Sequence, residues 1–236
     1  MNHLKLLFSL FTSLLLFSCT TIKSTSTSNL VTDEVIVDSP EELSKELLSN
    51  RITVHDTVFV NLKEYSTDFI FDMKYATTDN FLKTQVYDCA TCLLRFKTVK
   101  NLILANEEFK TKGYRIKIFD CYRPLDVQKK MWKIVSDPEY VADPKKGSIH
   151  NRGGAVDISL VDFDGNTVDM GTTFDFFGPE ASHFYQKLPN STLKNRLLLK
   201  QIMLKHNFSS FDSEWWHYNL RNSSKWPLAN FKWECK

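Results

Sequence analysis

The sequence lacks an excess of charge of one sign. Its 236 residues include 30 Lys and Arg against 28 Asp and Glu, which gives a formal net charge of +2. No run of basic residues and no RNA-binding motif occurs, so the electrostatic signature of a nucleic-acid-binding protein is absent. The composition therefore predicts partners that are small or nearly neutral, and no nucleic acid.

Glycine-rich phosphate-binding loops are also missing, and no internal repeat is evident. Because strand-like and helix-like segments alternate without such loops, we predict an α+β fold with a mainly antiparallel sheet flanked by helices, not a nucleotide-binding α/β fold. With 42% hydrophobic and 13% aromatic residues, the chain can bury one core, which predicts a single domain.

Periodicity places the main elements of this fold. Apolar residues recur at helical spacing in 93–110 and 193–207, and Pro124 suits the first turn of a helix that ends near residue 135. In segments 114–119 and 155–160 apolar and polar residues alternate, as in half-buried strands. Residues 215–220 are predicted to form the last strand.

The chain begins with an apolar run, residues 6–17, that is too short to span a bilayer. Preceded by Lys5 and the free amine, this run predicts an export signal over residues 1–19. The string LFSC that ends at Cys19 resembles the lipobox of bacterial lipoproteins. It predicts a periplasmic protein of the bacterial cell envelope, anchored to a membrane through lipidated Cys19. The alternative is an ordinary cleaved signal in which this cysteine is incidental.

The next segment, residues 20–49, starts with the polar string TTIKSTSTSN. Such a composition cannot bury apolar surface, so we predict a flexible tether here and a folded domain over residues 50–236. Four cysteines remain in that domain, an even number in a compartment where disulfides survive. Cys89 and Cys92 form a CxxC, but no second CxxC follows, so we favour disulfides or free thiols over a structural metal site. The pairing stays open.

Two histidines and an aspartate stand in distinctive strings. His150 and Asp157 lie in SIHNRGGAVD, and His217 follows Glu214 in EWWHY. Zinc in hydrolases commonly takes three nitrogen or oxygen ligands from the protein and keeps one position open. Two imidazoles and one carboxylate match that count, so we predict one Zn²⁺ per chain, held by His150, Asp157 and His217.

The spacing of these residues sets a geometric requirement. Residues three apart on a regular strand point to opposite faces, so Glu214 and His217 meet only if Glu214 precedes the strand at a bend or a bulge redirects it. The glycine pair 153–154 gives the backbone the freedom to turn His150 back toward Asp157.

The strings SIHNRGGAVDISL and EWWHY resemble the zinc-binding signatures of the D-alanyl-D-alanine dipeptidases, the VanX-type branch of the zinc D,D-peptidases in the M15 family. Three further strings resemble family segments in the same order: DMKYATTDNF (72–81), DCYRP (120–124) and MGTTFD (170–175). The likeness covers about residues 60–230 and implies the zinc D,D-peptidase, or hedgehog-like, fold.

The resemblance also implies roles for individual residues. His150, Asp157 and His217 would hold zinc. Glu214 would take a proton from the attacking water and pass it to the leaving amine. Arg123 would stabilise the negative charge that develops on the scissile carbonyl oxygen.

Three residues would contact the substrate by the same resemblance. Asp175 and Tyr75 would meet the ammonium group of a small D-amino-acid dipeptide, and Ser148 would lie near its carboxylate. Two of these assignments have structural alternatives. Arg123 could instead form an ion pair with Asp120, and Asp175 could cap a turn.

The leading functional hypothesis is zinc-dependent hydrolysis of D-Ala-D-Ala in cell-wall peptide metabolism. A second is a D,D-carboxypeptidase or endopeptidase that acts on peptidoglycan stem peptides with the same metal chemistry. A third is a non-catalytic lipoprotein that binds dipeptides, against which the presence of Glu214 argues. The sequence predicts no particular oligomeric state.

Overall fold

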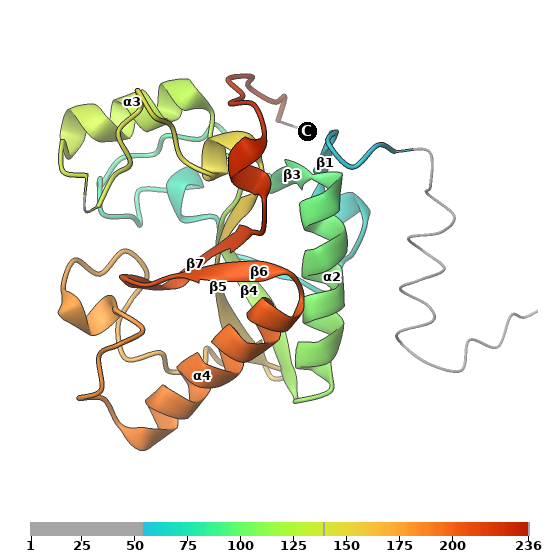
Figure 1. The fold of residues 1–236 in the computed structure, drawn as a ribbon, viewed down its shortest axis with the longest axis vertical. Coiled ribbons are helices and arrows are strands. Elements are labelled where there is room, and N and C mark those ends of the chain that lie inside the picture. Colours follow the sequence, from blue (N-terminus) through green and yellow to red (C-terminus); the bar gives the residue numbers. More distant parts are fainter. Residues whose placement is uncertain (1–53, 139, 236) are drawn as a thin grey trace, which may run out of the picture. The chain divides into compact units, whose positions relative to one another are not determined.

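The computed structural model describes residues 54–138 and 140–235, and Figure 1 shows its α+β architecture. The α-helices in this part of the chain are α2 (Phe96–Lys110), α3 (Leu125–Ile134) and α4 (Asn190–Lys205). The strands are β1 (Phe59–Asn61), β2 (Ile70–Phe71), β3 (Leu93–Arg95), β4 (Tyr114–Asp120), β5 (Ala155–Asp162), β6 (Phe208–Phe211) and β7 (Glu214–Leu220). The predicted signal, the lipobox with Cys19 and the tether lie outside the described residues.

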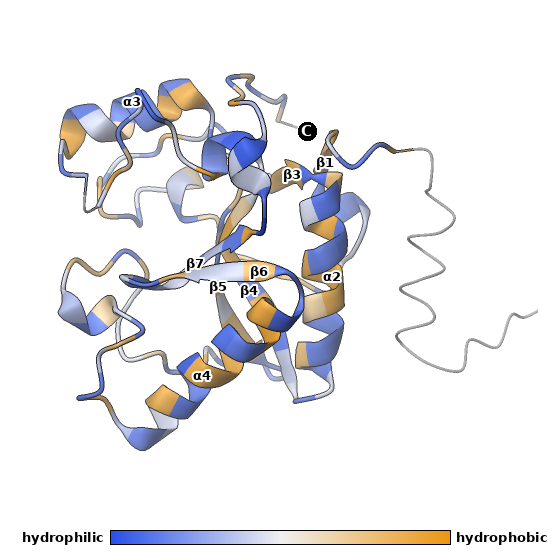
Figure 2. Cartoon of the chain, viewed as in Figure 1, coloured by the Kyte–Doolittle hydropathy of each residue, from blue (hydrophilic) through white to orange (hydrophobic). Residues whose placement is uncertain are grey.

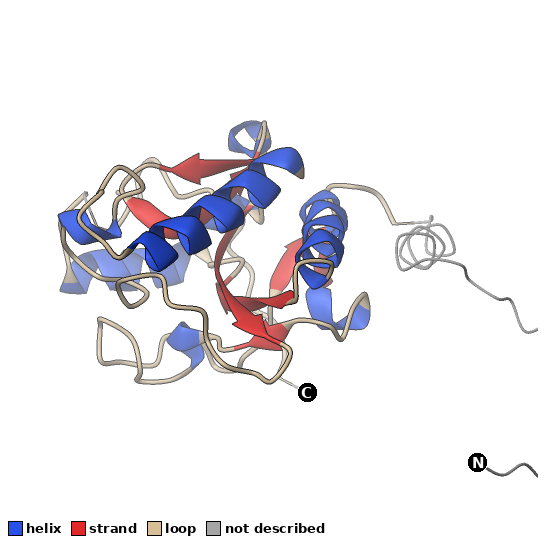
Figure 3. Ribbon diagram, turned by 90° about the horizontal axis from the view of Figure 1, so that it is seen from below, coloured by secondary structure: helices blue, strands red, loops and turns tan. Residues whose placement is uncertain are grey.

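Five of the strands form one mixed sheet in the order β2-β4-β5-β7-β6. β2 runs parallel to β4, whereas the pairs β4–β5, β5–β7 and β7–β6 are antiparallel, which confirms the mainly antiparallel sheet. The helices lie around the strands (Figure 3). α2 packs against β4, α4 packs against β6, and the two helices contact each other.

The core lies between these helices and the sheet. Figure 2 shows hydrophobic and hydrophilic residues alternating along α2 and α4, as expected of helices with one face toward a core. β5 is buried along nearly its whole length, on both faces. No helix among the described residues is long and apolar enough to cross a membrane.

The prediction of a helix from residue 93 is wrong at its start. Leu93–Arg95 is strand β3, which pairs antiparallel with β1, and the helix begins at Phe96. Arg95 keeps an extended backbone, so pairing with a distant strand overrides the local helical periodicity. The other predicted helices and strands agree with the structure to within three residues at each end.

The end of the chain is tied to the loop that precedes β5. The backbone N–H of Ala229 donates to the carbonyl of Asn151 at 2.8 Å, and the N–H of Leu125 donates to the carbonyl of Ala229. Phe231 stacks on Tyr122, with ring centroids 4.7 Å apart. The last residues therefore support a loop that carries functional side chains.

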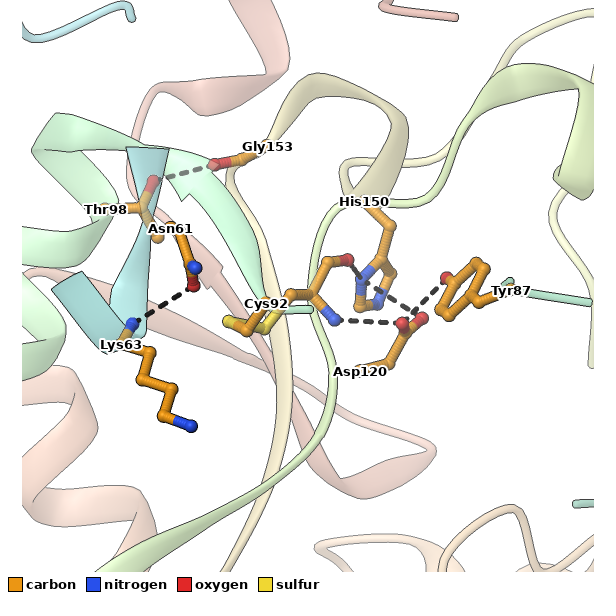
Figure 4. Close-up of a disulfide and its surroundings, with 9 residues drawn as sticks. Asn61, Lys63, Tyr87, Cys92, Thr98, Asp120, His150 and Gly153 are labelled. Atoms are coloured by element: carbon orange, nitrogen blue, oxygen red, sulfur yellow. Dashed lines mark hydrogen bonds and ion pairs between the residues drawn. A yellow bond between two sulfur atoms is a disulfide. The ribbon is translucent and has the colours of Figure 1, made fainter. Parts of the chain in front are cut away.

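All four cysteines of the domain are paired, Cys89 with Cys235 and Cys92 with Cys121. This agrees with the preference for disulfides or thiols over a structural metal site and resolves the open pairing. The first bridge attaches the C-terminal segment to Cys89, and the second joins the residue before β3 to the residue after β4 (Figure 4).

Replacing Cys89 and Cys235 together with Ser is expected to lower the free energy of unfolding by about 2–5 kcal/mol. The bridge spans 146 positions, so its loss frees a large part of the unfolded chain. Urea denaturation of both proteins measures the difference, and the retained Cys92–Cys121 bridge serves as an internal control. An unchanged unfolding midpoint would show that this bridge adds nothing to stability.

Candidate metal centre

The three predicted metal ligands converge. His150 Nε2 lies 3.3 Å from Asp157 Oδ2 and 3.2 Å from His217 Nδ1, and His217 Nδ1 lies 3.0 Å from Asp157 Oδ1. His150 comes from the short 3-10 helix η3 (His150–Arg152), whereas Asp157 on β5 and His217 on β7 are directly opposite each other in the sheet. Strand pairing thus brings together ligands that are 60 positions apart.

The glycine pair positions His150. Gly153 has φ of +68°, a left-handed conformation that favours glycine, and it ends η3 just before β5 begins. A Cβ atom on Gly153 would lie 2.3 Å from a ring carbon of Phe59, and one on Gly154 would lie 2.4 Å from Cβ of Ser223. The backbone turn and the close packing both require glycine here, as the sequence predicted for the turn.

Hydrogen bonds fix the orientation of both imidazole rings through the nitrogen that faces away from the other candidate ligands. His150 Nδ1–H donates to the carbonyl of Cys121 at 2.7 Å (Figure 4), and His217 Nε2–H donates to Asn219 Oδ1 at 2.9 Å. Each ring therefore presents its other nitrogen to the common point, the arrangement that metal-binding histidines adopt. Asn219 was not predicted from the sequence, although its position two residues after His217 on one strand places it on the same face.

Burial and charge favour a cation at this point. Burial opposes ionisation of Asp157, but His150 and His217 lower its pKa below the usual range of a carboxyl group. Burial likewise opposes the charge on His217, but Asp157 raises its pKa. Two imidazole nitrogens and a carboxylate that turn toward one point in a buried site suit Zn²⁺.

Replacing Asn219 with Ala is expected to weaken metal binding about 10- to 100-fold, because His217 loses the acceptor that orients its ring. Competition with a chelator of known affinity measures the change. Asn101→Ala is the matched control, since that side chain donates to Lys97 in helix α2, away from the site. Equal metal affinity of the two variants would show that Asn219 has no orienting role.

Glu214 lies beside the ligands as predicted. It is the first residue of β7, and its Oε2 is 3.8 Å from His217 Nδ1. In the pairing of β6 with β7, Ser210 lies opposite Tyr218, but the next residue of β6, Phe211, lies opposite Glu214. The register of the two strands therefore shifts at this point. Of the two predicted alternatives, a bend before the strand or a bulge, this irregularity supports the bulge, which turns Glu214 and His217 to one side. Burial raises the pKa of Glu214, although His217 opposes the shift.

Arg123 is held at the site by an ion pair. Its Nη2 donates to Asp120 Oδ2 at 2.7 Å, and its Nη1 donates to Gln128 at 3.0 Å. Asp120 is completely buried and also accepts a hydrogen bond from Tyr87 at 2.8 Å. Burial opposes the charge on Arg123, but Asp120, Tyr87, Tyr75 and Asp157 together raise its pKa above that of a free guanidinium group. The ion pair with Asp120, the structural alternative, is therefore present and orients the guanidinium.

Tyr75 and Asp175 form another hydrogen-bonded pair of predicted site residues. The hydroxyl of Tyr75 donates to Asp175 Oδ2 at 2.8 Å. Burial, followed by the charge of Asp157, raises the pKa of Asp175 well above that of a free carboxyl group. Asp175 has φ of +55°, an uncommon conformation for a residue with a side chain, and such strain is often found at functional sites.

Ser148 lies just before the metal-binding turn. Its hydroxyl accepts a hydrogen bond from the backbone N–H of His150 at 3.2 Å. Together with the groups above, it lines a cavity of about 250 Å³. Every residue that the sequence analysis selected borders this cavity: Tyr75, Arg123, Ser148, His150, Asp157, Asp175, Glu214 and His217.

A family model described as D-Ala-D-Ala dipeptidase, Peptidase_M15, matches residues 55–232. The chain belongs to this family. It is 35% identical over 179 residues to the D-alanyl-D-alanine dipeptidase of Escherichia coli (strain K12), and the aligned region covers 76% of this chain and 93% of that protein. The D-alanyl-D-alanine dipeptidase of Enterococcus faecium is 30% identical over 202 residues, covering 75% and 98%.

As a member of the D-Ala-D-Ala dipeptidase family, the chain is a hydrolytic peptidase. The matched residues include every side chain that was predicted for the site, and they begin after the predicted signal and tether. The resemblance inferred from the short sequence strings is thereby confirmed.

Proposed function

We propose that this protein hydrolyses free D-Ala-D-Ala in cell-wall peptide metabolism and depends on one Zn²⁺ held by His150, Asp157 and His217. The observation that carries the proposal is the presence of a metal-ligand triad, Glu214 and a buried carboxyl group, Asp175, in one small cavity. We further propose that its sheet and helices form the hedgehog-like fold of zinc D,D-peptidases.

The chemistry is divided among these groups. Zinc held by His150, Asp157 and His217 would act as a Lewis acid that lowers the pKa of water to about 7 and polarises a carbonyl. Glu214 takes the proton of the attacking water and delivers it to the leaving amine, a task favoured by the pKa that burial raises. Arg123, immobilised by Asp120 and Gln128, stabilises the negative charge on the carbonyl oxygen.

Recognition of a free dipeptide follows from the buried carboxyl group. Asp175 gains a counter-ion when the substrate presents an ammonium group, and its Tyr75 partner holds the acceptor in place. An acylated amine brings no charge and leaves the buried carboxylate of Asp175 without a counter-ion, which is costly. A dipeptidase is therefore favoured over a D,D-carboxypeptidase. We assign Ser148, which lines the same cavity, to the substrate carboxylate.

The test compares alanine release from D-Ala-D-Ala and from an N-acylated tripeptide ending in D-Ala-D-Ala, each with and without a chelator. We expect rapid release from the dipeptide alone, loss of activity with the chelator, and recovery on adding zinc. Preference for the acylated peptide would support the carboxypeptidase alternative. Activity that is insensitive to the chelator would refute the metal assignment.

We also propose that the protein resides in the periplasm of a bacterial envelope, anchored through lipidated Cys19. The support is the apolar run at residues 6–17, the lipobox-like string and two disulfides, which persist in oxidising compartments. Labelled palmitate should be incorporated into the wild-type protein and not into Cys19→Ala. Equal labelling of both proteins would refute the anchor.

A further inference from the structure

Three aromatic rings meet at the edge of the cavity. The ring of Phe177 lies 4.9 Å from that of Phe81 and 4.2 Å from that of Tyr140. Phe81 and Tyr140 line the cavity, whereas Phe177 does not line it but packs against both of their rings. The three residues come from separate segments, which are teal, yellow and orange in Figure 1. We call this group, Phe81, Phe177 and Tyr140, the aromatic bar.

The aromatic bar borders the part of the cavity that contains Asp175. Phe81 is in edge contact with Tyr75, at a centroid distance of 6.2 Å, and Tyr75 donates its hydroxyl hydrogen to Asp175. Phe177 follows Asp175 by two residues, after the left-handed turn at Asp175 itself. A dipeptide whose ammonium reaches Asp175 therefore places its N-terminal side chain close to these rings.

The rings of the bar suit a steric role. Phe177 is 41% exposed and Tyr140 is 39% exposed, so neither is held in the core. Rigid aromatic side chains have few rotamers, and contact across three segments restricts them further. Rings held in this way exclude substrate side chains that are too large for the pocket. Even one extra methylene in an apolar pocket changes kcat/KM about 10- to 200-fold.

We propose that the aromatic bar limits the size of the N-terminal side chain of the dipeptide. Phe81 and Tyr140 form the wall, and Phe177 is a positioning residue that holds both rings in place. The inference rests on the proposed dipeptidase function and on the pairing of the substrate ammonium with Asp175. It concerns the side chain next to that ammonium, and it makes no demand on the C-terminal residue of the substrate.

The experiment measures kcat/KM of the zinc-loaded enzyme for D-Ala-D-Ala, D-Phe-D-Ala and D-Ala-D-Phe. Phe177→Ala is expected to raise the ratio of D-Phe-D-Ala to D-Ala-D-Ala at least about tenfold and to leave the ratio for D-Ala-D-Phe unchanged. Phe176→Ala is the matched control, because Phe176 is 39% exposed on the same loop and is not part of the aromatic bar. Thermal unfolding verifies that both variants are folded.

A binding measurement separates this inference from the proposed function. Calorimetric titration of zinc-loaded Glu214→Gln with the same dipeptides, with and without Phe177→Ala, reports the size limit without turnover. If the wild-type protein does not cleave D-Ala-D-Ala but the variants show the expected affinity ratio, only the proposed reaction is wrong. Unchanged ratios in Phe177→Ala overturn the role of the bar, and absence of dipeptide binding in every protein overturns both proposals.

Discussion

Glu214→Gln is expected to retain bound zinc and to lose about 10²- to 10⁴-fold in kcat for D-Ala-D-Ala, the range that general acid–base catalysis typically contributes. The amide keeps the size of the side chain but cannot take up the proton. Glu214 lies 3.8 Å from His217 Nδ1, farther than the contacts within the triad, so the ligands keep their positions. Metal analysis and steady-state kinetics of the same preparation measure both quantities.

The exposed Glu234 offers a matched control, since Glu234→Gln makes the same chemical change away from the cavity. Full activity of Glu214→Gln would refute the acid–base role of this residue. Loss of zinc in this variant would instead identify Glu214 as a ligand. If the wild-type protein binds D-Ala-D-Ala but does not cleave it, the non-catalytic alternative is correct.

Arg123→Ala is expected to lower kcat by about 10²- to 10³-fold, the typical effect of removing one donor to a developing oxyanion. It is also expected to destabilise the fold by about 3–5 kcal/mol, because Asp120 is then left as an unpaired buried charge. Arg123→Lys keeps the charge but loses the planar fork that reaches both Asp120 and Gln128, so we expect partial recovery of stability.

A double variant separates the two effects. In Arg123→Ala with Asp120→Asn the orphaned charge is removed, so stability should return while kcat stays low. Urea denaturation and kinetics with D-Ala-D-Ala give the two readouts. If kcat returns together with stability, Arg123 acts only as the structural partner of Asp120.

Much of the site could be predicted because the ligands lie in short strings with distinctive spacing. Asn219 was not predicted, although strand alternation alone places it on the face of His217. The carbonyl of Cys121 could not be predicted, because a backbone acceptor has no sequence signature and becomes available only when β4 ends beside His150. The helix predicted from residue 93 started too early because β1 recruits Leu93–Arg95 into a sheet.

The types and approximate bounds of most elements could be inferred from the sequence alone, since helical and strand periodicities are local properties of the chain. The sequence also predicted the two histidines and one aspartate that the fold brings together. Three features become visible only in the folded chain: the pairing of the cysteines, the contacts of Asp120 and Gln128 with Arg123, and the meeting of Phe81, Tyr140 and Phe177. These contacts join residues far apart in the chain, and local patterns carry no information about which distant segments the packing of the core brings together.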